Sequence, residues 1–224
     1  MLARTHVLSG ACACAGLGPT LGVHDPLRLL AMAVAGGGAA LLADLDHHSG
    51  TASKTWGPIT RVLGRQVGRI TGGHRQGTHT VLAAVLAAVA VHFTMGVYPY
   101  AALPLVALMV GLCLVAWEDL IPGRKWERLW PANLGASFGI AGALLLTGLA
   151  DGWLPVAVGV GWLAHVVGDA MTVGGVRPWM PLSNAKLRLS RLRTGGKILG
   201  FRWEPAAQGT FGVATVALLM IGIR

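Results

Sequence analysis

Charged residues are scarce in this sequence. They make up 12% of its 224 residues, and Asp and Glu number only nine against 18 Lys and Arg. Such a chain cannot cover itself with the charged surface of an ordinary soluble domain. Cysteine is also rare, with three residues, and Cys12 and Cys14 lie two positions apart, where they would point to different sides of a helix. A disulfide-stapled scaffold is therefore excluded, and we expect these cysteines to act as small packing residues.

Apolar sequence is abundant instead. Hydrophobic residues make up 54% of the chain, glycine contributes 33 residues, and long apolar runs recur. A helix of about 20 apolar residues crosses the roughly 30 Å of membrane hydrocarbon. We therefore predict an all-α, polytopic membrane protein with six to seven transmembrane helices in a single domain, residues 1–224. The predicted spans, of which the first is the weakest because glycines interrupt it, are 7–22, 27–43, 79–97, 101–117, 132–150, 153–173 and 208–223.

Basic residues are confined to alternate connections. Fifteen of the 18 Lys and Arg lie between the second and third, fourth and fifth, and sixth and seventh spans, whereas the connections at 98–100 and 150–152 contain none. This bias predicts a multi-pass protein of a bacterial-type inner membrane whose basic connections face the cytoplasm. Orientation and attraction to anionic lipid account for the charge, so no nucleic-acid partner is expected. Apolar and basic residues alternate over 186–204, which favours a short cytoplasmic β-hairpin turning at 195–196, with an amphipathic helix as the alternative.

Histidine and aspartate residues gather on the same predicted side of the membrane. They come from the inner ends of four predicted spans that are far apart in the sequence. Ionisable groups beside spans are costly and usually functional, and Asp and neutral His are ligands of zinc and similar metals. The set, which we predict to form a metal site, is His6, Asp44, Asp46, His47, His74, His79, His165 and Asp169.

Each part of this set also has an ordinary explanation. Asp44, Asp46 and His47 could be a solvated helix end, and residues 72–79 could be a flexible loop. His165 and Asp169 are four residues apart, so they could simply share a hydrogen bond on one helical face. The metal hypothesis rests on their joint placement, because the charge bias that fixes the topology uses none of these residues.

Four ordered segments resemble a known family. They are THVLSG (5–10), DLDHHSG (44–50), HRQGTHT (74–80) and HVVGDAMTVGGVRPWMP (165–181). They resemble the membrane-bound metal-dependent hydrolase family, also described as LexA-regulated, inner-membrane-associated hydrolases, and more distantly the zinc-dependent phospholipase C group. The resemblance implies a helical hydrolase whose metal is held by the eight residues above. Ala43 stands where that family usually has Pro, and Thr80 where Ser is common, and neither change removes a ligand.

The predicted chemistry is hydrolysis of a phosphoester at the cytoplasmic membrane face. Eight ligands suffice for one or two divalent ions, zinc or alternatively manganese, which would activate water. The substrate would be a membrane lipid headgroup or another phosphoester. We expect Arg75 to clamp phosphate, unless it only adds to the cytoplasmic charge, and Asp46 to act as general base if it is not a ligand. Thr78 and Thr172 would orient imidazole or carboxylate groups.

Two alternatives stay open at this stage. A metal or proton transporter would also use intramembrane His and Asp, but it should place polar groups at the bilayer midplane. A structural or regulatory membrane protein with a metal staple would need only about four ligands and no open coordination position.

Overall fold

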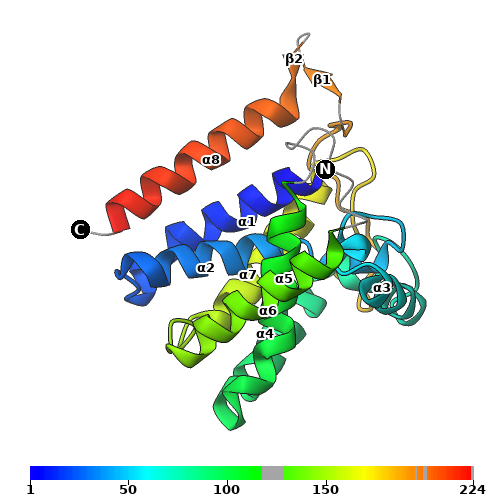
Figure 1. Cartoon of the computed structure of the whole chain (residues 1–224). Coiled ribbons are helices and arrows are strands. Elements are labelled where there is room, and N and C mark those ends of the chain that lie inside the picture. Colours follow the sequence, from blue (N-terminus) through cyan, green and yellow to red (C-terminus); the bar gives the residue numbers. More distant parts are fainter. Residues whose placement is uncertain (118–128, 195, 199–200, 223–224) are drawn as a thin grey trace.

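The computed structural model describes residues 1–117, 129–194, 196–198 and 201–222. The middle basic connection, with Arg124, Lys125 and Arg128, lies outside these ranges, as does half of the predicted turn at 195–196. The chain folds as a helical bundle (Figure 1), so the all-α prediction is confirmed. The helices are α1 (Ala3–Leu17), α2 (Pro26–Ala39), α3 (Pro58–Ile70), α4 (Val81–Val97), α5 (Leu103–Val115), α6 (Trp130–Leu146), α7 (Leu154–Ala170) and α8 (Trp203–Gly222). Short 3-10 turns are η1 (Pro19–Leu21), η2 (Ala43–Asp46), η3 (Ala52–Lys54), η4 (Gly77–His79) and η5 (Pro99–Ala102).

Two helical stretches of the described chain are long and apolar enough to cross a membrane. They are Pro26–Asp46, which is mostly buried inside the protein, and Trp203–Gly222, which is almost wholly exposed. Four other apolar helices are shorter, at 10–17 residues. A helix of 17 residues is only about 26 Å long, less than the roughly 30 Å of hydrocarbon. Two candidate spans are therefore found among the described residues, and the predicted six to seven spans are not confirmed.

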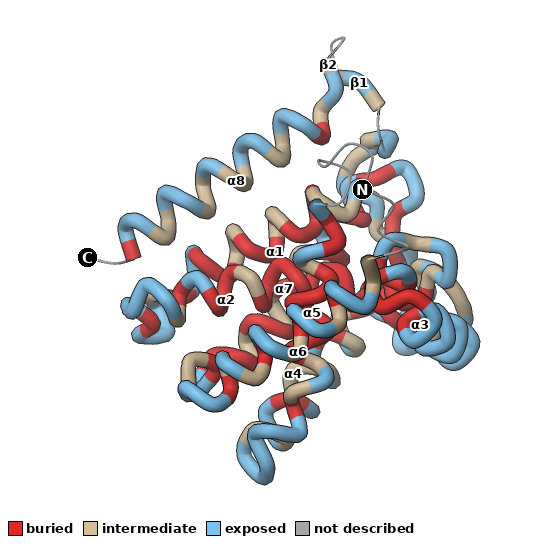
Figure 2. Tube along the Cα trace, in the orientation of Figure 1, coloured by how far each residue is buried: buried red, intermediate tan, exposed pale blue. Residues whose placement is uncertain are grey.

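Helix α2 lies at the centre of the bundle, and a run of glycines lets its neighbours approach. A Cβ on Gly10 of α1 or Gly161 of α7 would overlap the carbonyl of Gly36, and a Cβ on Gly38 would overlap the backbone of Met109 in α5. Small residues at such crossings bring helix backbones together in membrane proteins. The buried residues cluster along these crossings (Figure 2). The same helix continues into η2, so its packing sets the position of Asp44.

Local capping fixes the segment before α4. The hydroxyl of Thr80 accepts a hydrogen bond from the N–H of Ala83 at 3.0 Å, which caps α4 at its first turn. The indole N–H of Trp162 in α7 donates to the carbonyl of Thr78 at 2.7 Å. His79 is held between these two bonds, just before α4 begins at Val81 rather than inside the span predicted from residue 79.

The predicted hairpin is shorter than expected. Strands β1 (Lys197–Ile198) and β2 (Phe201–Arg202) pair antiparallel over two residue pairs, Lys197 with Arg202 and Ile198 with Phe201. All four paired residues therefore lie after the turn predicted at 195–196. Upstream, backbone bridges join Thr172 to Leu192 and Val176 to Leu187, so this basic segment lies beside the C-terminal end of α7.

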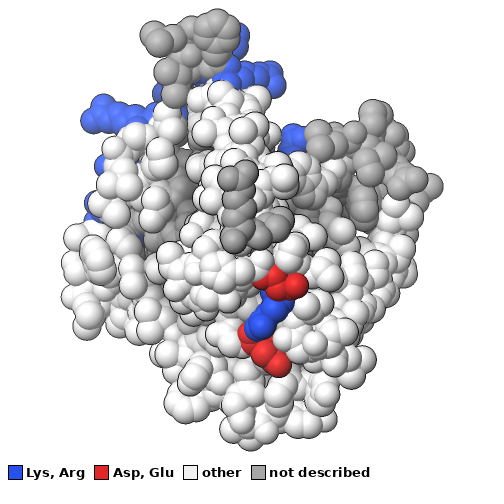
Figure 3. All heavy atoms as spheres, turned by 90° about the vertical axis from the view of Figure 1, so that its left-hand side faces the viewer, with Lys and Arg blue, Asp and Glu red and all other residues white. Residues whose placement is uncertain are grey.

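Charge is unevenly distributed over the surface. The N-terminus, the β1–β2 hairpin and α3 lie at one side of the molecule, and the C-terminus lies at the opposite side (Figure 1). The latter side is shown face-on in Figure 3, where basic side chains lie along the upper and left-hand edges, apart from one that lies between two acidic side chains. This face is otherwise uncharged in the part of the chain that the structure describes.

Candidate metal centre

Four segments bring acidic and imidazole side chains to one place. The N-terminal half of α1 carries His6, η2 carries Asp44, η4 ends at His79, and the last two turns of α7 carry His165 and Asp169. The three histidines and Asp169 are at most 1% exposed, whereas the side chain of Asp44 is 25% exposed. Buried ionisable groups of this kind require a charge partner or a metal. The convergence predicted from the sequence is therefore present.

Two imidazole nitrogens each lie close to two carboxylate oxygens. His79 Nε2 and His165 Nε2 are 3.1 Å apart, and each lies 3.6 Å from Asp44 Oδ1. Asp169 Oδ2 lies 3.6 Å from His79 Nε2 and 3.8 Å from His165 Nε2. Ligand atoms at about 2.0–2.1 Å from a tetrahedral zinc lie about 3.3–3.4 Å from one another. The spacing of the two imidazole nitrogens from each other and from each of the two carboxylate oxygens therefore fits a divalent metal ion of that size.

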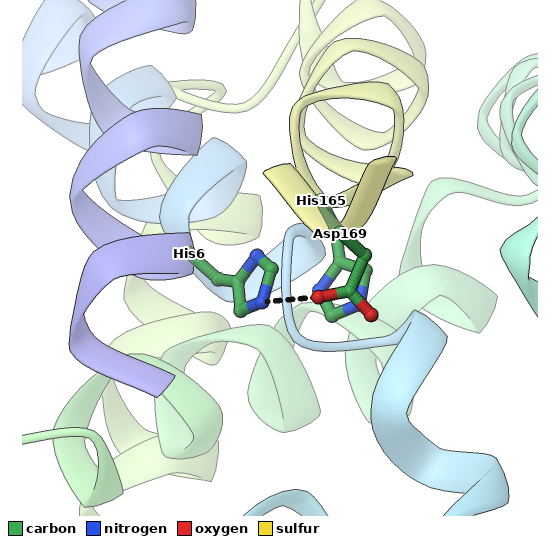
Figure 4. Close-up of side chains that lie close together, drawn as sticks. All are labelled: His6, His165 and Asp169. Atoms are coloured by element: carbon green, nitrogen blue, oxygen red, sulfur yellow. Dashed lines mark ion pairs between the residues drawn. The ribbon is translucent and has the colours of Figure 1, made fainter. Parts of the chain in front are cut away.

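His6 extends the cluster on the side of α7. Its Nε2 lies 3.4 Å from Asp169 Oδ1, and its ring stacks on that of His165 with centroids 3.8 Å apart (Figure 4). The Nδ1 atoms of His6 and His165 are buried without a hydrogen-bond partner among the described residues. Two groups of three residues satisfy metal-ligand spacing, His6 with His165 and Asp169, and Asp44 with His74 and His79. The donor set therefore fits one ion or two adjacent ions.

Asp46 occupies a different place from Asp44, although only one residue separates them. Both lie in η2, whose 3-10 winding turns residues two apart to different sides. Asp46 Oδ2 accepts hydrogen bonds from the hydroxyl of Thr78 at 2.5 Å and from the N–H of Arg75 at 3.2 Å. Its Oδ1 lies 2.9 Å from His74 Nδ1, and Oδ2 lies 3.4 Å from His79 Nδ1. Carboxylates placed in this way orient the imidazoles that bind metals. The predicted roles of Asp46 as ligand or base stay predictions, and its contacts fit an orienting group better.

In the metal-free cluster, burial and two neighbouring carboxylates set the pKa of His79. Burial alone would lower the pKa of His79, but its contacts with the carboxylates of Asp44 and Asp46 outweigh burial and raise that pKa to about 9. His79 precedes α4 and so lies outside the span. A proton therefore supplies positive charge among these carboxylates, and a metal ion that binds there must displace it.

Arg75 connects the cluster to an adjacent cavity. Its Nη2 lies 3.0 Å from Asp169 Oδ2, and its Nη1 donates to Thr172 Oγ1 at 3.2 Å. Arg75 also has a positive φ of 62°, which is uncommon for a residue other than Gly, Asn or Asp and is found at strained functional positions. Thr172 therefore contacts the guanidinium of Arg75, whereas Thr78 contacts the carboxylate of Asp46, and the orienting roles predicted for both threonines stay predictions.

The cavity has a volume of about 260 Å³ and opens beside the ligands. Its lining includes His6, Asp44, His47, His74, Arg75 and Asp169. His47 is the predicted ligand that stands apart. Its ring contacts the edge of His74 with centroids 4.6 Å apart, and it belongs to neither metal-ligand group of the described residues.

Two residues near the cluster were not predicted. The amino group of Met1 lies 3.0 Å from Asp169 Oδ1, a contact that no sequence pattern indicates. Trp162 precedes His165 by one helical turn and holds the backbone of Thr78, as described above. In the sequence, a tryptophan one turn before a ligand histidine only weakly indicates a role in the site. The hydrogen bond from its indole to the carbonyl of Thr78 shows that role.

Comparison with known proteins gives a family. The family model described as YdjM inner membrane protein matches residues 1–140, which is more than half of the chain. No curated protein and no solved structure matches. The matched region contains His6, Asp44, Asp46, His74 and His79, whereas His165 and Asp169 follow it. The chain therefore belongs to the YdjM inner membrane protein family, and it brings a cluster of potential metal ligands to one end of its helical bundle.

Proposed function

We propose that this protein is a divalent-metal-dependent hydrolase that acts on phosphoesters at the cytoplasmic face of the inner membrane. The observation that carries the proposal is the convergence of His79 Nε2 and His165 Nε2, which lie 3.1 Å from each other and 3.6–3.8 Å from carboxylate oxygens of both Asp44 and Asp169. The cytoplasmic orientation and a multi-pass topology are supported by the confinement of basic residues to alternate connections.

The proposed ligands divide into two groups. His6, His165 and Asp169 would hold one ion, and Asp44, His74 and His79 would hold a second if two are bound. Zinc suits these donors, with manganese as the alternative. Such an ion supplies Lewis-acid activation of water and of a phosphoryl oxygen.

The chain's own residues would position the substrate. Two guanidinium nitrogens of Arg75 are fixed by Asp169 and Thr172, and its side chain is 26% exposed and lines the cavity. An arginine has five N–H donors, so N–H groups remain for phosphate oxygens. Among the three carboxylates, Asp44 is the most exposed and lines the cavity, so it can contact water or substrate there. Asp46 is fully enclosed and would keep His74 and His79 in their orientation.

The structure favours a hydrolase over the two alternatives. A metal that only staples helices requires a closed site, whereas here a cavity opens beside the ligands. A transporter requires polar groups through the bundle. Among the buried polar side chains of the described residues, Asn133 and Ser137 lie away from the site, and they bond to each other and to the carbonyl of Gly111.

Metal content and hydrolysis, measured together on detergent-purified protein, test the proposal. We expect the wild type to retain zinc or manganese and to hydrolyse a phosphodiester, and the His165→Ala/Asp169→Ala variant to lose both. His92→Ala is the matched control, because His92 is exposed on α4 and belongs to neither ligand group. Metal retained by the double variant would refute the site. Bound metal without hydrolysis of soluble or lipid phosphoesters would refute the enzyme and favour the staple.

A further inference from the structure

Helix α3 lies in the basic connection between the second and third predicted spans. It packs on the metal-centre loop through small residues. Thr60 and Gly64 are its buried positions, and a Cβ on Gly64 or Gly68 would come within 2.7 Å of the carbonyl oxygen of Leu45 or Asp46. The helix is therefore seated directly against η2, which carries Asp44 and Asp46.

A second sector of α3 is apolar and exposed. Ile59, Val62, Leu63 and Ile70 are 50%, 54%, 40% and 82% exposed. At about 100° per residue these positions fall within an arc of about 100° that does not overlap the packed sector. Gln66 also falls within this arc, and the other four exposed residues of the arc are apolar. An exposed face of this composition indicates a partner or a membrane.

The third sector is basic. Arg61, Arg65 and Arg69 recur every fourth residue, so they form one row beside the apolar sector, and all three are exposed. An apolar face flanked by arginines is the pattern of a helix that lies in the membrane interface, where arginine reaches phosphate groups.

The direction of α3 agrees with this pattern. Figure 1 shows α3 nearly end-on, whereas α1, α2 and α8 run across the page, so α3 runs across the direction of these helices. Figure 2 shows that its outer side is exposed. The stretch that contains α2 is long enough to cross the membrane, and α3 follows its inner end, so α3 would lie along the membrane surface.

We propose that α3 is an interfacial helix bound to the anionic phospholipids of the inner leaflet, with its apolar sector among the acyl chains and Arg61, Arg65 and Arg69 at the headgroup phosphates. A bilayer is favoured over a second copy of the chain, because a symmetric contact through this face would bring two rows of arginines together. Anionic lipid instead provides the complementary charge. This inference does not depend on the hydrolase proposal.

The proposed position of α3 also sets the depth of a neighbouring cavity relative to the membrane. A cavity of about 440 Å³ lies between α3 and the metal centre, and it is lined by Arg65, Arg69, His48, His74 and Asp46 among others. With α3 in the interface, this cavity lies at headgroup depth, and an anionic headgroup held by Arg65 and Arg69 would lie against the outer edge of the metal centre.

Spin-label accessibility measures the depth of α3 directly. Single-cysteine variants Ile59→Cys, Leu63→Cys and Arg61→Cys are made in a background that lacks Cys12, Cys14 and Cys113, and are reconstituted in vesicles of phosphatidylcholine and phosphatidylglycerol. We expect labels at 59 and 63 to collide more with oxygen than with a water-soluble nickel chelate, and the label at 61 to show the reverse order. Equal nickel access at all three positions would overturn the proposal, and shielding of 59 and 63 from both reagents would assign the face to a protein partner.

A charge variant tests the lipid specificity. Adding phosphatidylglycerol to phosphatidylcholine vesicles should shift the label at 63 deeper, and Arg61→Gln/Arg65→Gln/Arg69→Gln should abolish that shift. The matched control removes the same charge from exposed positions of the last basic segment, Arg188→Gln/Arg191→Gln/Arg193→Gln, and should retain the shift. Absence of a shift in the parent protein, or its equal loss in both variants, would contradict a role for the α3 arginines.

Discussion

Substituting Asp46 by Asn should weaken metal binding without removing a ligand. The change keeps the shape of the side chain but removes its charge, and it places an N–H₂ group where Oδ1 or Oδ2 now accepts contacts from His74, Thr78 and the N–H of Arg75. At least one of these contacts would then join two donors. Loss of an orienting carboxylate typically reduces metal affinity about 10–100-fold, which corresponds to about 1.4–2.7 kcal/mol.

Competition against a fluorescent chelator, on detergent-purified protein, measures this change. Asp25→Asn is the matched control, because Asp25 caps α2 at its other end, away from the ligands, and Asn caps helices about as well as Asp. Unchanged affinity in Asp46→Asn would refute the orienting role. A complete loss of metal, equal to that of the His165→Ala/Asp169→Ala variant, would show instead that Asp46 is itself a ligand.

Three further predictions concern the same protein. Thr78→Val should reduce metal affinity less than Asp46→Asn does, since it removes one hydrogen bond and no charge, and Thr78→Ser should restore it in the same chelator assay. Gly38→Ala should lower the free energy of unfolding by about 1–3 kcal/mol through overlap with the backbone of α5, whereas Gly139→Ala, with no atom near its Cβ, should not, as thermal unfolding in detergent would show. Because the pKa of His79 is raised from 6.5 to about 9, its stabilisation of the metal-free fold is fully present below about pH 6.5 and is lost as pH rises through about 9, so chelator-treated protein should lose thermal stability across that window. Stability that rises across that window would contradict the assignment.

The location of the site could be predicted because it depends on topology alone. Asp44, His79 and His165 each lie at the end of an apolar run that the charge bias places on one side, and helices packed side by side bring such ends together. Local geometry could not be predicted in the same way. Asp44 and Asp46 look equivalent in the sequence. Their contacts differ because the 3-10 winding of η2 turns the two side chains to different sides, and because the hydroxyl of Thr78 lies on the side of Asp46.

Helix α3 was not predicted, for a related reason. Its apolar residues alternate with Arg61, Arg65 and Arg69, so no continuous apolar run marks it. Its arginines recur with a helical period, but a basic connection between two spans explains their charge without a helix. The predicted spans 101–117 and 153–173 run past the ends of α5 and α7, because apolar residues such as Trp117 and Trp153 lie in the adjoining turns, where hydrophobicity alone does not distinguish helix from loop.

The positions of His6 and Asp169 constrain how the protein is made. His6 lies in a helix that is synthesised well before the helix that carries Asp169, yet the two side chains face each other at 3.4 Å. The nascent chain therefore exposes its first histidine long before the partner carboxylate exists, and the centre can close only after α7 has been inserted beside α1. Translation that stops before α7 leaves the chain without His165 and Asp169, two of the three ligands proposed for the first ion, so under that proposal this ion binds only after α7 is in place.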